Sequence, residues 1–270
     1  MKQILLKIIL CITFIVSLGC GLVLVVHVYQ AKDAQAKLEK LAQVQHMRSV
    51  PNATHYAPNQ QTASIAENSS QVCSAPLVCE YENMFKQNPN MVAWIAIENT
   101  DFSYPVMQSS KRPNYYLRRN FEGKYSEYGT PYLSETCDIA ASDNLVIHGH
   151  NIENGKMFGL LEEYKKKAFW EQHPIITLNT KNEKRTYQIF CVSLVTAFSP
   201  LVDAFPYYSF TQANTAEEYN NYIKNVKKYA IYDTGLSPEN EVQLITLSTC
   251  EYSQENGRLI VVAYLNEALD

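Results

Sequence analysis

Cys250 is the residue whose type and position point most directly to covalent chemistry. It follows an apolar run that starts at Val242, and the β-branched residues and partial alternation of this run predict a strand that ends near the cysteine. After a short polar loop, Arg258 opens a second strand-like run over 259–265. We therefore expect a thiol and a guanidinium at the ends of adjacent strands, where a thiolate could attack a carbonyl and the guanidinium could stabilise the oxyanion. An inert, buried cysteine in a sheet is the alternative.

A thiol nucleophile also needs a proton donor for its leaving group, and two histidines are placed to serve. His148 and His150 close the predicted strand 144–147, so at least one imidazole should stand at a strand end, as the cysteine does. Histidines two residues apart on a strand share a face and could hold a metal ion, with Asp138 and Asp143 nearby. Because that spacing matches no metal signature, we expect neither a metal nor another cofactor.

The elements that position these residues are mostly short strands. Nineteen tyrosines among 270 residues favour a β-rich fold, since aromatic side chains suit a half-buried pleated surface. About eight short strands in the C-terminal two thirds of the chain favour a closed barrel or a sandwich over a parallel α/β sheet. The predicted strands cover 91–97, 102–107, 130–134, 144–148, 175–178, 186–195, 242–249 and 259–265.

Three segments of the same region are predicted to be helical. They cover 78–87, 157–164 and 215–229. The last has Thr215 and Glu218 at the spacing of a capping box. It lies in the long connection that leads to the cysteine strand, where it either helps to select the substrate or covers the edge of a sheet.

The N-terminal region is predicted to anchor the protein in a membrane. The 19 residues 8–26 carry no charge and are enough to cross a hydrocarbon core of about 30 Å as a helix. Lys2 and Lys7 precede this run and favour a cytoplasmic N-terminus, although lysines beyond the run weaken the bias. A cleaved signal peptide is one alternative, and a lipoprotein site at Ser17-Leu18-Gly19-Cys20 is another.

The domain organisation follows from these changes in composition. Residues 1–29 form the cytoplasmic N-terminus and transmembrane anchor, 30–76 form a helical stalk and a flexible linker, and 77–270 form the folded domain. Seven cysteines without a CxxC pair argue against a zinc knuckle and a dense disulfide scaffold, and the pairing of Cys73 with Cys79 stays open. The net charge of −4 gives no reason to expect nucleic-acid binding.

One motif resembles the signature of a known family. Thr246-Leu247-Ser248-Thr249-Cys250 followed by Arg258 is similar to the sortase signature, T-L-x-T-C with an arginine on the next strand. The similarity spans about 78–264 and is closest to class B sortases. The further segments that carry it are Asn88-Pro89, Trp94-Ile95, Tyr104-Pro105-Val106, Tyr115-Tyr116-Leu117, Asn120-Phe121, Gly149-His150-Asn151 and Gly155-Lys156-Met157-Phe158-Gly159.

This resemblance implies a mainly β fold, a closed eight-stranded sortase-type barrel with an N-terminal helix and an extra helix before the cysteine strand. It also implies roles for single residues. Cys250 matches the nucleophile, Arg258 matches the arginine that steadies the substrate carbonyl or oxyanion, and His150 matches the catalytic histidine, which follows a glycine in the family. His148 stands where the family commonly has tyrosine.

Two further residues of the motif, Ser248 and Thr249, are expected from the same resemblance to help bind substrate. The implied reaction is transpeptidation, in which a C-terminal sorting signal of a surface protein or pilin is cleaved through a thioester. The acceptor is an amine of a cell-wall precursor peptide or a pilin lysine, and the domain acts outside the cytoplasm as a single-pass membrane protein. A cysteine peptidase and a non-catalytic, cell-wall-binding β-domain are the competing interpretations.

Overall fold

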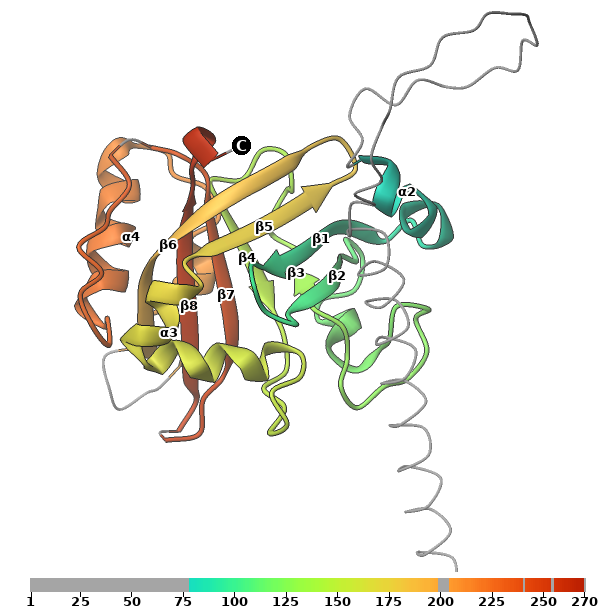
Figure 1. Ribbon diagram of the computed structural model, residues 1–270, viewed down its shortest axis with the longest axis horizontal. Helices are drawn as coiled ribbons and strands as arrows, with labels where there is room; N and C mark the ends of the chain where they lie inside the picture. The colour runs from blue at the N-terminus through green and yellow to red at the C-terminus, as the bar shows by residue number, and fades with distance from the viewer. Residues whose placement is uncertain (1–77, 199–203, 240, 254, 270) are drawn as a thin grey trace, which may run out of the picture. The chain divides into compact units, whose positions relative to one another are not determined.

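The computed structural model describes residues 78–198, 204–239, 241–253 and 255–269. Within these ranges eight strands close into one barrel in the order β1-β2-β3-β4-β7-β8-β6-β5 (Figure 1). The barrel confirms one of the two β architectures that the strand pattern favours and excludes the sandwich. The predicted membrane anchor, stalk and linker lie outside the described residues. In the part of the chain that is described, no helix is both long enough and apolar enough to cross a membrane.

All eight predicted strands are present, each within a few residues of its expected ends. Neighbouring strands pair in antiparallel fashion except for β2 with β3 and β4 with β7, which are parallel. The strands are β1 (Met91–Ile97), β2 (Ser103–Met107), β3 (Tyr132–Leu133), β4 (Asn144–His148), β5 (Ile175–Thr180), β6 (Lys184–Thr196), β7 (Leu244–Cys250) and β8 (Gly257–Leu265).

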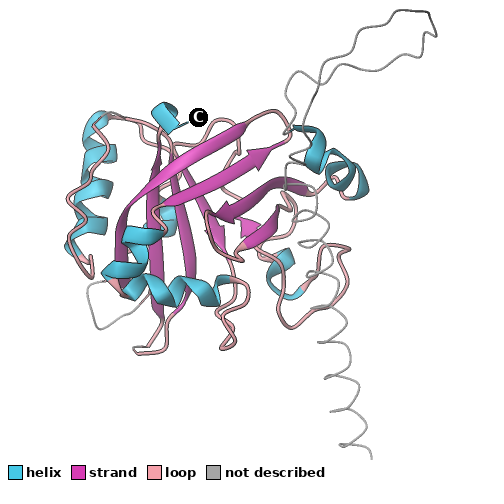
Figure 2. Cartoon of the chain, in the orientation of Figure 1, coloured by secondary structure: helices cyan, strands magenta, loops and turns pink. Residues whose placement is uncertain are grey.

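The helices lie around this barrel (Figure 2). The predicted helix over 157–164 is present but has 3₁₀ geometry, and a six-residue α-helix after it was not predicted, because no side chain caps its start. The α-helices are α2 (Val78–Gln87), α3 (Lys167–Gln172) and α4 (Ala216–Lys228). The 3₁₀ helices are η1 (Tyr115–Arg118), η2 (Phe158–Lys165), η3 (Tyr207–Ser209) and η4 (Glu267–Leu269).

Helix α4 starts where the capping pattern predicts. The Thr215 side chain accepts a hydrogen bond from the Glu218 backbone N–H at 3.2 Å. The Glu218 carboxylate, however, accepts from the Asn214 N–H at 2.8 Å, so the capping box forms in one direction only. The buried face of α4, which includes Tyr222 and Val226, packs on the barrel at β6 (Figure 1). The helix therefore covers the sheet, and a part in substrate selection stays a prediction.

The strands share one continuous apolar core. Side chains from across the barrel, such as Ile95 of β1, Val146 of β4, Val192 of β6 and Val261 of β8, are fully buried within it. Close packing of this kind restricts the backbone, so the strand ends are held in fixed positions relative to one another. Residues at neighbouring strand ends can therefore form a rigid site.

Candidate active site

The predicted nucleophile and arginine lie opposite each other at the ends of β7 and β8. Cys250 and Arg258 are cross-strand partners in the antiparallel pair, so their side chains leave the sheet on the same face. The six residues of β7 before Cys250 are buried, and the cysteine is the first one that is partly exposed. Arg258 Nη1 donates a hydrogen bond to the Gly257 carbonyl at 2.8 Å. The expected juxtaposition of thiol and guanidinium is confirmed.

Three tyrosines lie near this pair. Burial raises the pKa of Tyr132, Tyr207 and Tyr252, and in each case a negative charge on Cys250 raises the pKa further while the charge of Arg258 lowers it. The two charges act on all three phenols because both groups lie close to them. The tyrosines come from β3, from η3 and from the loop after β7, so the mouth of the site is built from distant parts of the chain.

His150 reaches the same end of the barrel from β4, the parallel neighbour of β7. His148 is in register with Ser248, and the Gly149 N–H donates to the Ser248 carbonyl at 3.1 Å. β4 ends at His148 and β7 ends at Cys250, so His150 follows β4 at the same end of the barrel as the cysteine. Its Nε2 lies 2.7 Å from the Leu117 carbonyl oxygen.

The contact with Leu117 assigns the hydrogens of the His150 ring. A carbonyl oxygen only accepts, so Nε2 carries a hydrogen and Nδ1 is the nitrogen left to exchange a proton. Burial lowers the pKa of His150 below its ordinary value; the hydrogen bond to Leu117 opposes this, and the charge of Arg118 adds to it. The neutral imidazole is therefore the main form at neutral pH.

His148 has a different environment. Its ring packs on Tyr132, with the ring centroids 5.3 Å apart. Burial, together with the positive charge of Arg258, lowers its pKa to about 4. His148 is therefore uncharged at neutral pH and is a poor proton donor.

We expect the stability of the protein to fall between pH 6.5 and pH 4 partly because of His148. The pKa is about 4 in the folded protein and near 6.5 in an unfolded chain. Between these values the unfolded chain binds more protons, so this stabilisation is complete above pH 6.5 and is lost as the pH falls. Urea unfolding at pH 7 and pH 5 should show a decrease in the free energy of unfolding that is larger in the wild type than in His148→Tyr by up to about 2 kcal/mol. An equal decrease in both proteins would contradict this.

The two weaker candidates, Ser248 and Thr249, are each 2% exposed. The Thr249 hydroxyl donates to the Gly149 carbonyl at 2.8 Å, which ties the cysteine strand to the histidine loop. The Ser248 hydroxyl lies 2.6 Å from the Tyr207 hydroxyl. Both side chains thus have partners inside the protein, and their predicted contact with substrate stays a prediction.

A ring of buried polar side chains lies further back along β4 and β7, away from Cys250. Thr246 Oγ1 donates to Asn144 Oδ1 at 2.8 Å, and the Tyr222 hydroxyl lies 3.0 Å from Thr246 Oγ1. Asn144 Nδ2 in turn lies 3.3 Å from the Tyr222 hydroxyl. Since Tyr222 belongs to α4, this ring fixes the helix to β4 and β7. Satisfied polar groups of this kind specify one arrangement of a core.

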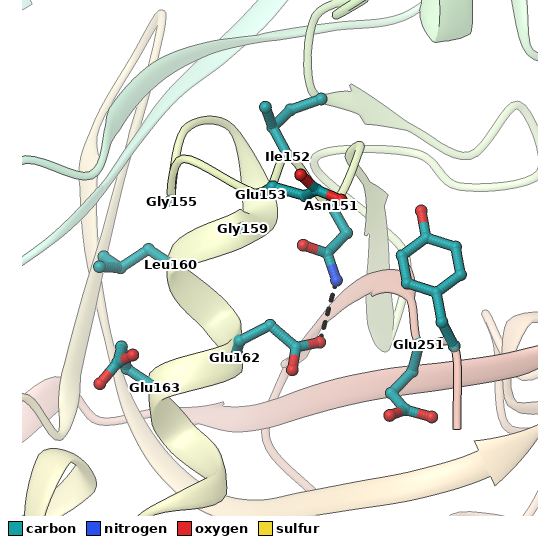
Figure 3. A pocket seen from close by; sticks show the side chains of 10 residues that line it. Asn151, Ile152, Glu153, Gly155, Gly159, Leu160, Glu162, Glu163 and Glu251 are labelled. Atoms are coloured by element: carbon teal, nitrogen blue, oxygen red, sulfur yellow. Dashed lines mark hydrogen bonds between the residues drawn. The ribbon is translucent and has the colours of Figure 1, made fainter. Parts of the chain in front are cut away.

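A pocket of about 610 Å³ lies next to the end of β7 (Figure 3). Its walls come from the loop after His150, from η2 and from the two residues after Cys250. Figure 3 shows the Asn151 side chain directed at Glu162, with which it forms a hydrogen bond. The lining residues are Asn151, Ile152, Glu153, Gly155, Gly159, Leu160, Glu162, Glu163, Glu251 and Tyr252.

The aspartates weighed as metal ligands have other partners. Asp143 Oδ2 accepts hydrogen bonds from Gln212 and from the Ala213 N–H, and Asp138 Oδ1 accepts from the Ala140 N–H. Among the residues that the structure describes, no three or more histidine, cysteine, aspartate or glutamate side chains are grouped so as to hold a metal ion.

Comparison with known proteins places this chain in a family. The family model for the sortase domain matches residues 95–266 of this chain. The chain belongs to the sortase family. Sortases are cysteine transpeptidases, and the relatives of this chain are class B enzymes. The closed eight-stranded barrel is thus that of the sortase structures to which the chain is similar.

Three relatives illustrate the similarity. Sortase B of Staphylococcus aureus is 28% identical over 187 residues, which cover 68% of this chain and 73% of the relative. The X-ray structure of Clostridium perfringens sortase B matches with a TM-score of 0.62 at 28% identity, covering 69% of this chain and 99% of the other. The structure of a Staphylococcus aureus sortase B-substrate complex shares the fold, with a TM-score of 0.68 at 24% identity over 88% of this chain and 98% of the other.

Several residues of the site were not singled out from the sequence. Leu117 supplies the carbonyl that binds His150, and Asn151 donates to the Cys250 carbonyl. Tyr132 and Tyr207 lie near Cys250 and Arg258. Leu117 and Asn151 lie within segments that resemble class B sortases, so the motif marks their neighbourhood. The two tyrosines have no local signal, because their partners come from distant strands.

Proposed function

We propose that this sortase is held in the membrane by its N-terminal segment, cleaves a C-terminal sorting signal through a thioester on Cys250, and transfers the protein to an amine of a cell-wall precursor. One observation supports this best: Cys250 pairs with Arg258 at a partly exposed strand end, and His150 is on the adjoining loop. This arrangement brings together a nucleophile, an oxyanion donor and an acid.

The chemistry assigns one task to each group. The Cys250 thiol gives its proton to the neutral His150, and the resulting thiolate attacks the threonine carbonyl carbon of the sorting signal. A C–S bond forms, and the electron pair on oxygen is stabilised by Arg258. The C–N bond then breaks while His150 gives a proton to the leaving amine. An incoming amine attacks the thioester and loses its proton to His150, and the C–S bond breaks to restore the thiolate.

Similarity supports the class of substrate. One structural relative is sortase B of Staphylococcus aureus in complex with its substrate. From this likeness we propose that the present chain recognises a peptide sorting signal on surface proteins. A pilin as substrate, with its lysine as the amine, is the alternative assignment within the family.

The proposed anchor is supported by the sequence of the N-terminal region. Residues 8–26 form an uncharged run of the length that spans a bilayer as a helix. We propose a single span with a cytoplasmic N-terminus and a catalytic domain on the outer surface. Both substrates would then be confined to that surface, where tethering raises their effective concentration.

The test of the reaction is product analysis with and without an added amine. The full-length protein in detergent is incubated with a library of sorting-signal peptides, together with a cell-wall precursor peptide or a pilin-type lysine peptide. We expect a ligated product that depends on the amine, with the cell-wall peptide the better acceptor. Hydrolysis alone in the presence of either amine would instead identify a cysteine peptidase, and preference for the lysine peptide would identify a pilin-polymerising enzyme.

A further inference from the structure

Asn151 connects the histidine loop directly to the nucleophile. Its Nδ2 group donates to the Cys250 carbonyl oxygen at 2.9 Å and to Glu162 Oε1, also at 2.9 Å. Both hydrogens of the amide group are thereby used. The first bond joins residues 99 positions apart, and the second joins the histidine loop to η2 (Figure 3).

These contacts belong to a closed ring. Lys165 Nζ lies 2.7 Å from Glu162 Oε2 and 2.8 Å from Glu251 Oε1. Because Glu251 follows Cys250 in the chain, the ring runs from Asn151 through the cysteine, Glu251, Lys165 and Glu162 back to Asn151. It holds three segments together: the histidine loop, η2 and the end of β7.

The ring is partly removed from water. The Glu251 side chain is 5% exposed, while those of Lys165 and Glu162 are about a third exposed. Burial opposes ionisation of Glu251, but hydrogen bonds from Lys165 and Ser253 still hold its pKa below the ordinary value. Burial likewise opposes the charge of Lys165, yet its bonds to the two glutamates raise its pKa. Hydrogen bonds between charged groups in such surroundings are stronger than neutral ones in water.

The position of Asn151 in the sequence connects this ring of contacts with the proposed reaction. The residue directly follows His150, so one short segment carries both the acid and the group that holds the nucleophile's carbonyl. Other bonds between the two segments are made one or two residues further back, from Gly149 to Ser248 and from Thr249 to Gly149. Of these three contacts, the Asn151 bond alone acts on the peptide plane of the cysteine itself.

We propose that Asn151 is a positioning residue for the sortase reaction, which fixes the separation and orientation of Cys250 and His150 through its bond to the Cys250 carbonyl. The inference rests on the proposed roles of these two residues. Asn151 acts on the chemical step and not on peptide binding, because its amide hydrogens are directed to groups within the protein. A misplacement of about 1 Å between reacting groups can cost on the order of 100-fold in rate.

The test compares variants of the full-length protein in acyl-enzyme formation with a sorting-signal peptide. We expect Asn151→Ala to lower kcat about 10- to 100-fold while KM stays within about twofold of the wild type. Asn151→Asp keeps the size of the side chain but has no donor, and it should lose at least as much. Asn151→Gln, which keeps the amide, should recover part of the rate. Asn154→Ala, an exposed asparagine of the same loop, is the matched control and should keep the wild-type kcat.

A second comparison separates positioning from folding. Glu162→Ala should lower kcat in the wild type but add little in Asn151→Ala, since the two residues act through one ring. Wild-type kcat in Asn151→Asp would overturn the proposal, because the hydrogen bonds would then be dispensable. The proposal would also be overturned if the loss of kcat in every variant merely paralleled a decrease in its melting temperature. If the wild type itself forms no acyl-enzyme, the proposed function fails and this inference fails with it.

Discussion

Replacing Cys250 by alanine is expected to abolish the thioester adduct and to lower the rate of peptide cleavage by more than about 10⁴-fold. No other group at the site can form the C–S bond, while Arg258 and His150 remain in place. Intact-mass spectrometry after incubation with a sorting-signal peptide measures the adduct, and peptide mapping locates it. Because the replaced side chain lies at a partly exposed strand end, the variant should keep its fold.

The chain provides matched controls in its buried cysteines. Cys137 and Cys191 are 6% and 1% exposed, and burial raises the pKa of each thiol to about 11. Neither forms much thiolate at pH 8, so iodoacetamide should modify Cys250 and leave these two intact in the folded protein. Cys137→Ala and Cys191→Ala should still form the adduct. An adduct that persists in Cys250→Ala would refute the assignment, and an unreactive Cys250 would favour a non-catalytic β-domain.

Most of the barrel could be predicted because each strand is a short apolar run in the sequence, and polar segments separate one run from the next. The expected strand 130–134 is an exception, since β3 covers only Tyr132–Leu133. Pro131 directly precedes it and has no N–H to donate to a sheet ladder, which limits the strand at this end. Helix α3 was not predicted because Lys166, the residue before it, provides no side-chain cap that would mark the start of a helix.

The site was predictable to the extent that its geometry is local. Cys250 and Arg258 are eight positions apart on two strands joined by a short loop, so their approach follows from the hairpin. The pairing of β4 with β7 is parallel and joins segments about 100 residues apart, so the choice of His150 depended on the family motif. The bond from His150 to Leu117 and the bond from Asn151 to Cys250 arise only once the barrel has closed. No periodicity in the sequence records such contacts.

The second large effect is expected at the histidines. His150→Ala should lower kcat by about 10²- to 10⁴-fold, the range that general acid catalysis contributes, while His148→Ala should cause a smaller loss. His150 keeps Nδ1 for proton exchange, whereas His148 packs on Tyr132 and has a pKa of about 4 beside Arg258. At pH 7 only a group that gains a proton readily can return it to the leaving amine.

Single-turnover acylation at pH 7 measures this difference, and His173→Ala provides the control. The His173 ring contacts the Glu98 carbonyl, away from the residues of the site, so its removal should leave the rate unchanged. An equal loss in His148→Ala and His150→Ala would contradict the choice of His150 as the acid. His148→Tyr adds a sharper comparison: since tyrosine is common at this position in the family, that variant should retain more activity than His148→Ala. The ring at this position would then support the wall of the site beside Tyr132, while the proton comes from His150 alone.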